Sequence, residues 1–163
     1  SCAPRLAAMA DDHSASASIE ITAPPEVVYA LITDVGRMGE WSPEATGASS
    51  VKGSLQVGDT FRGHNKRGLI RWYTHCTVRE AQPGRKFVFD VDSGPMPVSR
   101  WTYTFEPTAT GCRLTETWDD RRFGPLGPVI RTVGSVIIPG PRAAHNQQNI
   151  EITLQRLKAA AES

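Results

Sequence analysis

The sequence lacks the signatures of several common protein classes. Its 163 residues include only three cysteines, Cys2, Cys76 and Cys112, which are widely spaced and form no CxxC pair. Neither a disulfide framework nor a zinc site is therefore expected, and reduced thiols favour a cytoplasmic protein. The 18 basic residues nearly balance the 17 acidic ones, and no lysine or arginine run exceeds two residues. Because phosphate contacts usually need a concentrated basic face, no nucleic-acid partner is expected.

Long apolar runs and catalytic motifs are also missing. No stretch approaches the roughly 18–20 apolar residues of a membrane span, so stable membrane insertion is not expected. There is no GxSxG, HExxH or Walker loop and no glycine fingerprint after a strand, so no cofactor or metal is expected. Residues 1–17 are small and polar without the apolar centre of a secretory signal, and we expect a disordered tail before a single domain over 18–162.

Alternating apolar and polar residues predict a series of short strands in the middle of the chain. These strands are predicted at residues 17–22, 44–52, 60–66, 69–81, 86–91, 98–106 and 112–121. Helical patterns begin at Pro25, recur over 34–41 and cover 141–161. The predicted order is β-α-α-β-β-β-β-β-β-α, an α+β protein in which a curved antiparallel sheet wraps around one long helix. Such a sheet can enclose a cavity.

Large aromatic side chains gather on one face of the predicted sheet. Successive strand residues point to opposite faces, so parity assigns each side chain. The more apolar parity, which should face inward, carries Trp72, Phe89, Trp101, Tyr103 and Trp118. Each of these rings could belong to the core, or it could line a cavity for a mostly apolar small molecule.

Two polar residues share this inward parity, Asn65 and Glu116. A buried carboxylate is costly unless it is paired, hydrogen-bonded or protonated. Both residues could orient a polar group of a ligand. Alternatively, Glu116 could lie near an open edge or be satisfied by Tyr103 or Arg71. Burial would raise the pKa of Glu116 towards neutrality, which also makes it the candidate general base of an enzyme.

Two further candidates lie outside the strands. Trp41 sits in the short helical turn before Ser42-Pro43 and could cover the mouth of a cavity. Asn146, near the start of the last helix, could face the sheet, and His145 beside it could assist a reaction or be merely structural. The segment 123–141, rich in glycine and proline around an apolar run, could close over the cavity, dock a small protein partner or form a homodimer.

Three segments carry a family resemblance: 19–44 (IEITAPPEVVYALITDVGRMGEWSPE), 61–78 (FRGHNKRGLIRWYTHCTV) and 97–120 (PVSRWTYTFEPTATGCRLTETWDD). With them the chain resembles the START-like, or SRPBCC, superfamily of polyketide cyclase/dehydrase-like proteins, and its small actinobacterial members most. The resemblance implies a helix-grip fold, in which a seven-stranded antiparallel sheet grips a long C-terminal helix. It also implies a lipid, sterol or polyketide-like ligand between the helix and the sheet.

The resemblance leaves the type of function open, because the family shares no universal catalytic motif and a fold alone does not decide a function. The first hypothesis is a binding protein for a hydrophobic or amphipathic molecule. The second is an enzyme of polyketide cyclase or dehydratase type that uses Glu116. The third is a protein-interaction module in a stress or toxin–antitoxin setting.

Overall fold

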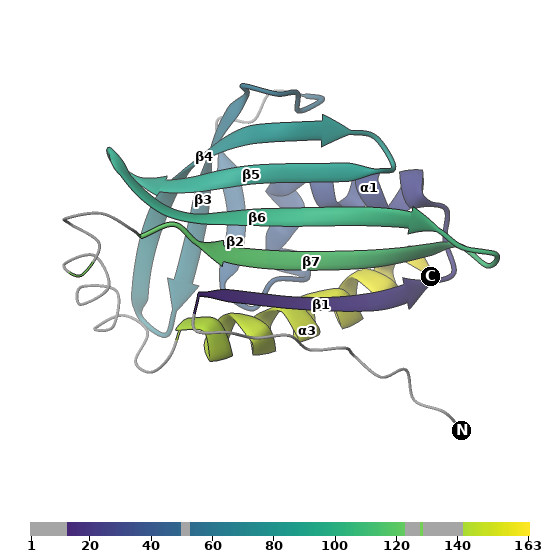
Figure 1. The fold of residues 1–163 in the computed structure, drawn as a ribbon. Helices are drawn as coiled ribbons and strands as arrows, with labels where there is room; N and C mark the ends of the chain where they lie inside the picture. The colour runs from purple at the N-terminus through teal and green to yellow at the C-terminus, as the bar shows by residue number, and fades with distance from the viewer. Residues whose placement is uncertain (1–12, 50–52, 123–127, 129–141) are drawn as a thin grey trace.

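A computed structural model describes residues 13–49, 53–122, 128 and 142–163 (Figure 1). Its order of elements is the expected one. The elements are β1 (Ser14–Ile21), α1 (Pro25–Thr33), the 3-10 helix η1 (Val35–Glu40), β2 (Ala45–Ser49), β3 (Thr60–Arg67), β4 (Ile70–Gln82), β5 (Lys86–Ser93), β6 (Met96–Pro107), β7 (Cys112–Asp120) and α3 (Arg142–Ala161).

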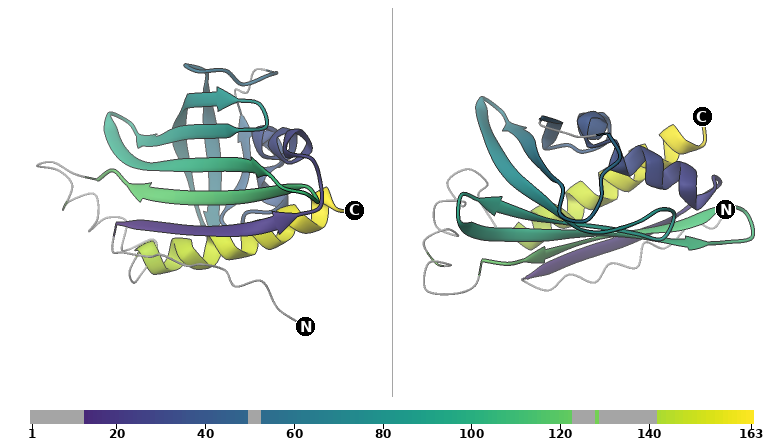
Figure 2. Two further views of the ribbon diagram at one scale, coloured as in Figure 1. Left: turned by 45° about the vertical axis from the view of Figure 1, so that its right-hand side comes forward. Right: turned by 90° about the horizontal axis from the view of Figure 1, so that it is seen from above.

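The seven strands form one antiparallel sheet in the order β1-β7-β6-β5-β4-β3-β2. Strands β5, β6, β7 and β1 run across the view of Figure 1, and β2 and β3 stand steeply behind them because the sheet curls into a half-barrel. Helix α3 lies inside the curl (Figure 2). The predicted α+β helix-grip architecture is confirmed. No helix in the described part of the chain is long and apolar enough to cross a membrane.

The first strand begins earlier than the alternation of isoleucines indicates. β1 starts at Ser14, within the segment predicted to be a disordered tail. Ala15 and Ala17 are almost completely buried. Alanine is small and depleted in strands, so a serine–alanine alternation gives a weak signal. The rest of the predicted tail, residues 1–12, and the predicted loop 123–141 apart from Pro128 lie outside the described residues.

The hydrophobic core lies between α3 and the inner face of the sheet. Ile150, Leu154 and Leu157 follow one another at helical spacing and are fully buried. From the sheet, Phe87 and Leu114 are equally inaccessible. Full burial of each such side chain contributes roughly 1.5–3 kcal/mol, so this contact holds the helix in the curl.

The same helix also covers the free edge of β1. The Gln147 side chain accepts a hydrogen bond from the Ser16 backbone N–H and donates one to the Ser16 carbonyl oxygen, both at 3.1 Å. Farther along, Lys158 Nζ donates to the Glu20 carbonyl oxygen at 2.8 Å. These side chains take the place of a neighbouring strand, which leaves less of the edge open to another chain.

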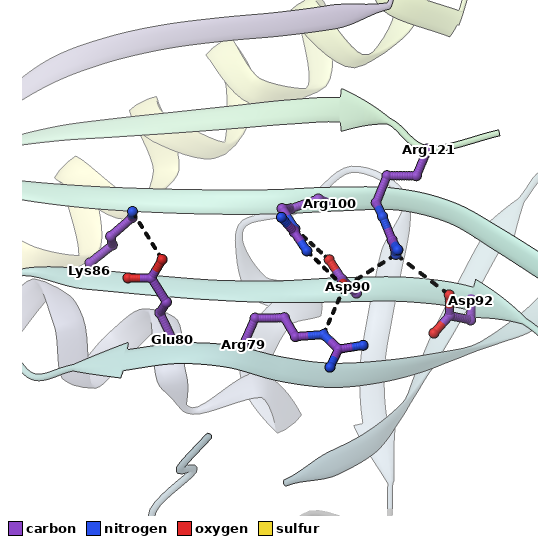
Figure 3. A network of polar contacts seen from close by, with 7 residues as sticks. All are labelled: Arg79, Glu80, Lys86, Asp90, Asp92, Arg100 and Arg121. Atoms are coloured by element: carbon purple, nitrogen blue, oxygen red, sulfur yellow. Dashed lines mark hydrogen bonds and ion pairs between the residues drawn. The ribbon is translucent and has the colours of Figure 1, made fainter. Parts of the chain in front are cut away.

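A polar network ties the strands together on the opposite, outer face (Figure 3). Asp90 of β5 is buried, and its carboxylate accepts hydrogen bonds from Arg79 of β4 at 2.8 Å and from Arg100 of β6 at 2.6 and 3.1 Å. Arg121 forms a further ion pair with it at 3.3 Å. Burial alone would raise the pKa of Asp90, but the hydrogen bonds from Arg100 and Arg79 lower it. The carboxylate therefore stays charged and links three strands.

The edge contact of α3 leads to a first prediction. Gln147→Ala leaves the Ser16 N–H and C=O without this partner, and we expect it to lower the free energy of unfolding by about 1–3 kcal/mol. Urea denaturation measures this loss. Gln148→Ala, at an exposed position of the same helix, is the matched control and should change little. Equal effects of the two substitutions would contradict a specific edge contact.

Candidate functional site: a cavity between helix and sheet

A cavity of about 140 Å³ opens between the N-terminal half of α3 and the inner face of the sheet. Its wall is mainly aromatic and aliphatic, with polar groups at a few points. The lining side chains come from η1 and the segment after it (Met38, Trp41), from β3 to β7 (among them Phe61, Trp72, Phe89, Val91, Trp101, Tyr103 and Glu116) and from α3 (Arg142, Asn146, Asn149, Ile150 and Thr153).

The fold brings eight of the nine predicted ligand-binding residues to this wall. They are Trp41, Asn65, Trp72, Phe89, Trp101, Tyr103, Glu116 and Asn146. Trp118 is the exception, since it has inward parity but is only 2% exposed and does not line the cavity. The register places it between Trp101 and Ala15, and Ala15 is itself fully buried. Trp118 is thus a core residue.

Glu116 is the most unusual polar group of the wall. Only 3% of the residue is exposed, and the Tyr103 hydroxyl donates a hydrogen bond to its Oε1 at 2.7 Å. Its Oε2 is buried without a hydrogen-bond partner among the described residues. Burial raises the pKa of Glu116 to about 8, although the hydrogen bond from Tyr103 acts in the opposite direction. Near neutral pH the carboxyl group is therefore mostly protonated.

Asn146 is another buried polar residue of the wall, with 1% of the residue exposed. Its Nδ2 has no hydrogen-bond partner within the described part of the chain. The next residue, Gln147, is held to Ser16, and the neighbouring Ala17 is paired with Glu116 in the β1–β7 register. The anchoring of α3 on β1 therefore brings Asn146 to the part of the sheet that carries Glu116.

A cluster around Glu44 lies where the segment before β2 meets α3. The Glu44 carboxylate accepts hydrogen bonds from Arg142 at 3.2 Å and Asn149 at 3.4 Å, and lies 3.0 Å from His145 Nε2. His145 does not line the cavity. Sequence reasoning missed Glu44, Arg142 and Asn149. Arg142 and Asn149 could have been identified from the sequence, because helical spacing places them on the same face of the last helix as Asn146 and Ile150.

Two other polar groups of the wall lie on the sheet, next to Thr74. Asn65 Nδ2 lies 3.5 Å from Thr74 Oγ1. Cys76 is buried, and burial raises the pKa of its thiol to about 12, so it is a poor nucleophile. In the described part of the chain no three His, Cys, Asp or Glu side chains gather in a way that could hold a metal ion.

The curled sheet, the gripped helix and the cavity between them define a helix-grip protein. The chain belongs to the family described as "Polyketide cyclase / dehydrase and lipid transport", whose model matches residues 12–162. This confirms the SRPBCC resemblance at the level of the family. No curated protein matches the sequence.

Solved structures agree with this assignment. A polyketide cyclase-like protein from Corynebacterium glutamicum is 31% identical, with a TM-score of 0.62 and coverage of 90% of each chain. A protein from Chromobacterium violaceum is 15% identical with a TM-score of 0.68, covering 94% of this chain and 99% of that one. A protein from Mycobacterium smegmatis is 17% identical with a TM-score of 0.61, covering 96% and 97%. The last two show the fold alone.

Burial of Glu116 gives stability a defined pH dependence. The folded protein keeps the carboxyl proton up to about pH 8, whereas an unfolded chain releases it near its ordinary pKa of 4.5. The free energy of unfolding should therefore be highest below about pH 4.5 as far as this group is concerned, and fall by on the order of a few kcal/mol as pH rises from about 4.5 to about 8. Glu116→Gln should lose this dependence and be more stable than wild type above pH 8.

Denaturation curves at a series of pH values measure the difference between wild type and Glu116→Gln. Glu106→Gln, which changes an exposed carboxylate of the same sheet, is the control and should follow wild type. If the free energies of unfolding of Glu116→Gln and wild type differ by the same amount at every pH, the Glu116 carboxyl group is not neutral in the folded protein.

Proposed function

We propose that the protein binds an apolar small molecule that bears a carbonyl oxygen, and that this molecule occupies the cavity between α3 and the sheet. The observation that carries the proposal is a pair of almost fully buried residues in a mainly aromatic and aliphatic wall, Glu116 and Asn146, whose Oε2 and Nδ2 have no hydrogen-bond partner among the described residues. Arg142 Nη1, on a less buried side chain of the same wall, is a third such atom. Unsatisfied buried polar groups cost roughly 1–3 kcal/mol each, so a ligand that satisfies Glu116 and Asn146 gains affinity.

The protonation state of Glu116 determines which ligand group fits. The pKa of Tyr103 is also raised well above its ordinary value, mainly by burial, so its hydroxyl stays protonated and donates to Oε1. The proton of Glu116 is then available on Oε2. Two donors, the Glu116 hydroxyl and the Asn146 amide, call for an acceptor oxygen. A carboxylic acid kept neutral in an apolar site can donate to a carbonyl oxygen in this way.

The size of the cavity narrows the ligand class further. A volume of about 140 Å³ is below the roughly 300–1,000 Å³ of pockets that bury drug-sized ligands. This favours a short or single-ring ligand, or one of which only a part enters, over a whole sterol. Trp72, Trp101 and Phe89 provide flat apolar surfaces against which such a group can stack.

Ligand titrations followed by tryptophan fluorescence test the proposal. Apolar ketones should bind with a saturable signal, and the corresponding hydrocarbons should bind roughly tenfold more weakly because they lack the acceptor. Asn146→Leu should reduce ketone affinity by a similar factor and leave hydrocarbon binding unchanged. Ketone affinity should also fall as pH rises through about 8, where Glu116 loses its proton.

Gln148→Leu is the matched control, since it makes the same change at an exposed position of α3. It should bind ketones as wild type does. Equal binding of ketones and hydrocarbons at every pH would refute the carbonyl preference. The lack of a saturable response to any apolar compound would refute small-molecule binding altogether.

A second candidate is an enzyme that closes or dehydrates a poly-carbonyl chain. One observation favours it: a pKa of about 8 allows Glu116 to exchange a proton close to neutral pH. Its ionised fraction could take a proton from the carbon beside a carbonyl group, while Asn146 donates to the carbonyl oxygen on which negative charge develops.

Glu116→Gln separates the enzyme from the binding protein. If the protein is a cyclase or dehydratase, this variant should lose turnover by about 10²–10⁴-fold while it still binds a ketone. Product formation from a diketone or longer poly-carbonyl substrate, measured by mass spectrometry, is the assay. Full turnover by Glu116→Gln would exclude the residue from the mechanism.

The similarity to a Corynebacterium protein supports a grouping with small actinobacterial members. We also propose a cytoplasmic location and a single domain, which was predicted over 18–162 and whose first strand begins at Ser14. The interaction-module hypothesis depends on segment 123–141, which, apart from Pro128, lies outside the described residues.

A further inference from the structure

The turn between β3 and β4 carries apolar side chains on its outside. Gly68, with φ of +60°, allows the tight reversal, and Leu69 beside it is 100% exposed. Ile70 is 44% exposed, and Tyr73 on the outer face of β4 is 61% exposed. Single exposed apolar residues are ordinary, but two in succession at the tip of a hairpin, with a third farther along β4, are a feature that folding alone does not require.

The same hairpin is strongly basic. Between residues 60 and 79 the chain contains five lysines and arginines and no aspartate or glutamate, although the whole chain has a net charge of only +1. The cations are Arg62, Lys66, Arg67, Arg71 and Arg79. Lys66 and Arg71 are directly opposite each other in the β3–β4 register. Like charges at such positions destabilise a sheet, so their presence suggests a role other than stability.

Few acidic groups are available to neutralise the end of this hairpin. The backbone N–H of Lys66 donates to the Glu44 carbonyl oxygen, but the Glu44 carboxylate is occupied by Arg142, His145 and Asn149. Asp90 is bound to Arg79, at the far end of the hairpin. Within the described part of the chain, the exposed side chains of Lys66 and Arg71 therefore form no ion pair with an acidic residue.

The hairpin end projects beyond the rest of the sheet and lies beside the cavity. Pairing of β4 with β5 ends at His75↔Asp92, so the residues between Ile70 and Thr74 pair with β3 only. The residues just inside the turn, Asn65 and Trp72, pair with each other and line the cavity. A surface that touches Leu69 is thus close to the ligand cavity.

We propose that the β3–β4 hairpin docks onto the surface of an anionic lipid bilayer. Leu69 and Ile70 enter the interfacial region, where aliphatic side chains gain by leaving water, and the exposed Lys66 and Arg71 lie at the level of the negatively charged headgroups. A bilayer surface matches both features of the hairpin, the apolar tip and the cations beside it. A partner that carries only negative charge would contact the cations but not the apolar tip. Docking would place the cavity next to the membrane and does not depend on which ligand the cavity takes.

Vesicle co-sedimentation of the full chain tests the inference. The protein should bind vesicles that contain phosphatidylserine, bind phosphatidylcholine vesicles much less, and dissociate as salt is added. Leu69→Ser with Ile70→Ser should lower the partition coefficient by roughly tenfold or more, because the apolar contribution is lost. Arg71→Gln should lower it about fivefold.

Val57→Ser is the control, because Val57 is 66% exposed on another loop. It should bind as wild type does. Thermal unfolding should be nearly unchanged in the tip variants, since Leu69 is fully exposed and Ile70 nearly half exposed. Absence of binding to phosphatidylserine vesicles at low salt overturns the proposal. The proposal is also overturned if the variant with serine at positions 69 and 70 binds the vesicles as strongly as wild type. That result would indicate a purely charged partner, such as a nucleic acid or an acidic protein.

Discussion

The packing of α3 inside the curled sheet determines both the stability of the protein and the place of its cavity. The C-terminal half of the helix presents Leu154 and Leu157 to the sheet and leaves no room there. The N-terminal half presents Arg142, Asn146 and Asn149, which cannot fill an apolar space, and the cavity lies at this end. The same helix thus stabilises the fold with one half and lines the cavity with the other. The hydrogen bonds of Gln147 to the edge of β1 fix which face of the helix points to the sheet.

The buried polar groups of the cavity lower the stability of the protein but provide hydrogen-bonding groups for a ligand. Among the described residues, Glu116 has a single hydrogen-bond partner and the Asn146 amide nitrogen has none, and both groups cost free energy when they are left in this state. Apolar residues at these positions would pack better, so the presence of these polar groups agrees with the proposal that a ligand satisfies them. Binding sites commonly keep such groups at the expense of stability.

Much of this architecture could be predicted from the sequence, because it follows from short-range patterns. Alternation along the strands placed Trp72, Trp101 and Glu116 on the inner face, and helical spacing identified the C-terminal helix. Parity cannot tell how far along the sheet a cavity extends, and for this reason Trp118 was wrongly expected to line it. The serine–alanine alternation at the start of β1 was too weak to recognise as a strand.

Features that depend on long-range contacts could not be predicted. Glu44 meets Arg142 and His145 only after about 100 residues of chain have folded. Asp90 is buried on an outer face because arginines from neighbouring strands cover it, which no local pattern indicates. The basic hairpin was visible in the sequence, but the near-neutral net charge obscured it because opposite charges lie elsewhere in the chain.

The most direct test of the account is a carbon-13 NMR titration of the Glu116 side-chain carboxyl group, with and without a bound ketone. The pKa of Glu116 should be near 8 in the ligand-free protein and higher with the ketone bound, because a carbonyl oxygen stabilises the protonated form. A pKa close to the ordinary 4.5 that the ketone does not change would show that Glu116 is ionised in the folded protein. The carbonyl-binding site proposed here would then have no basis.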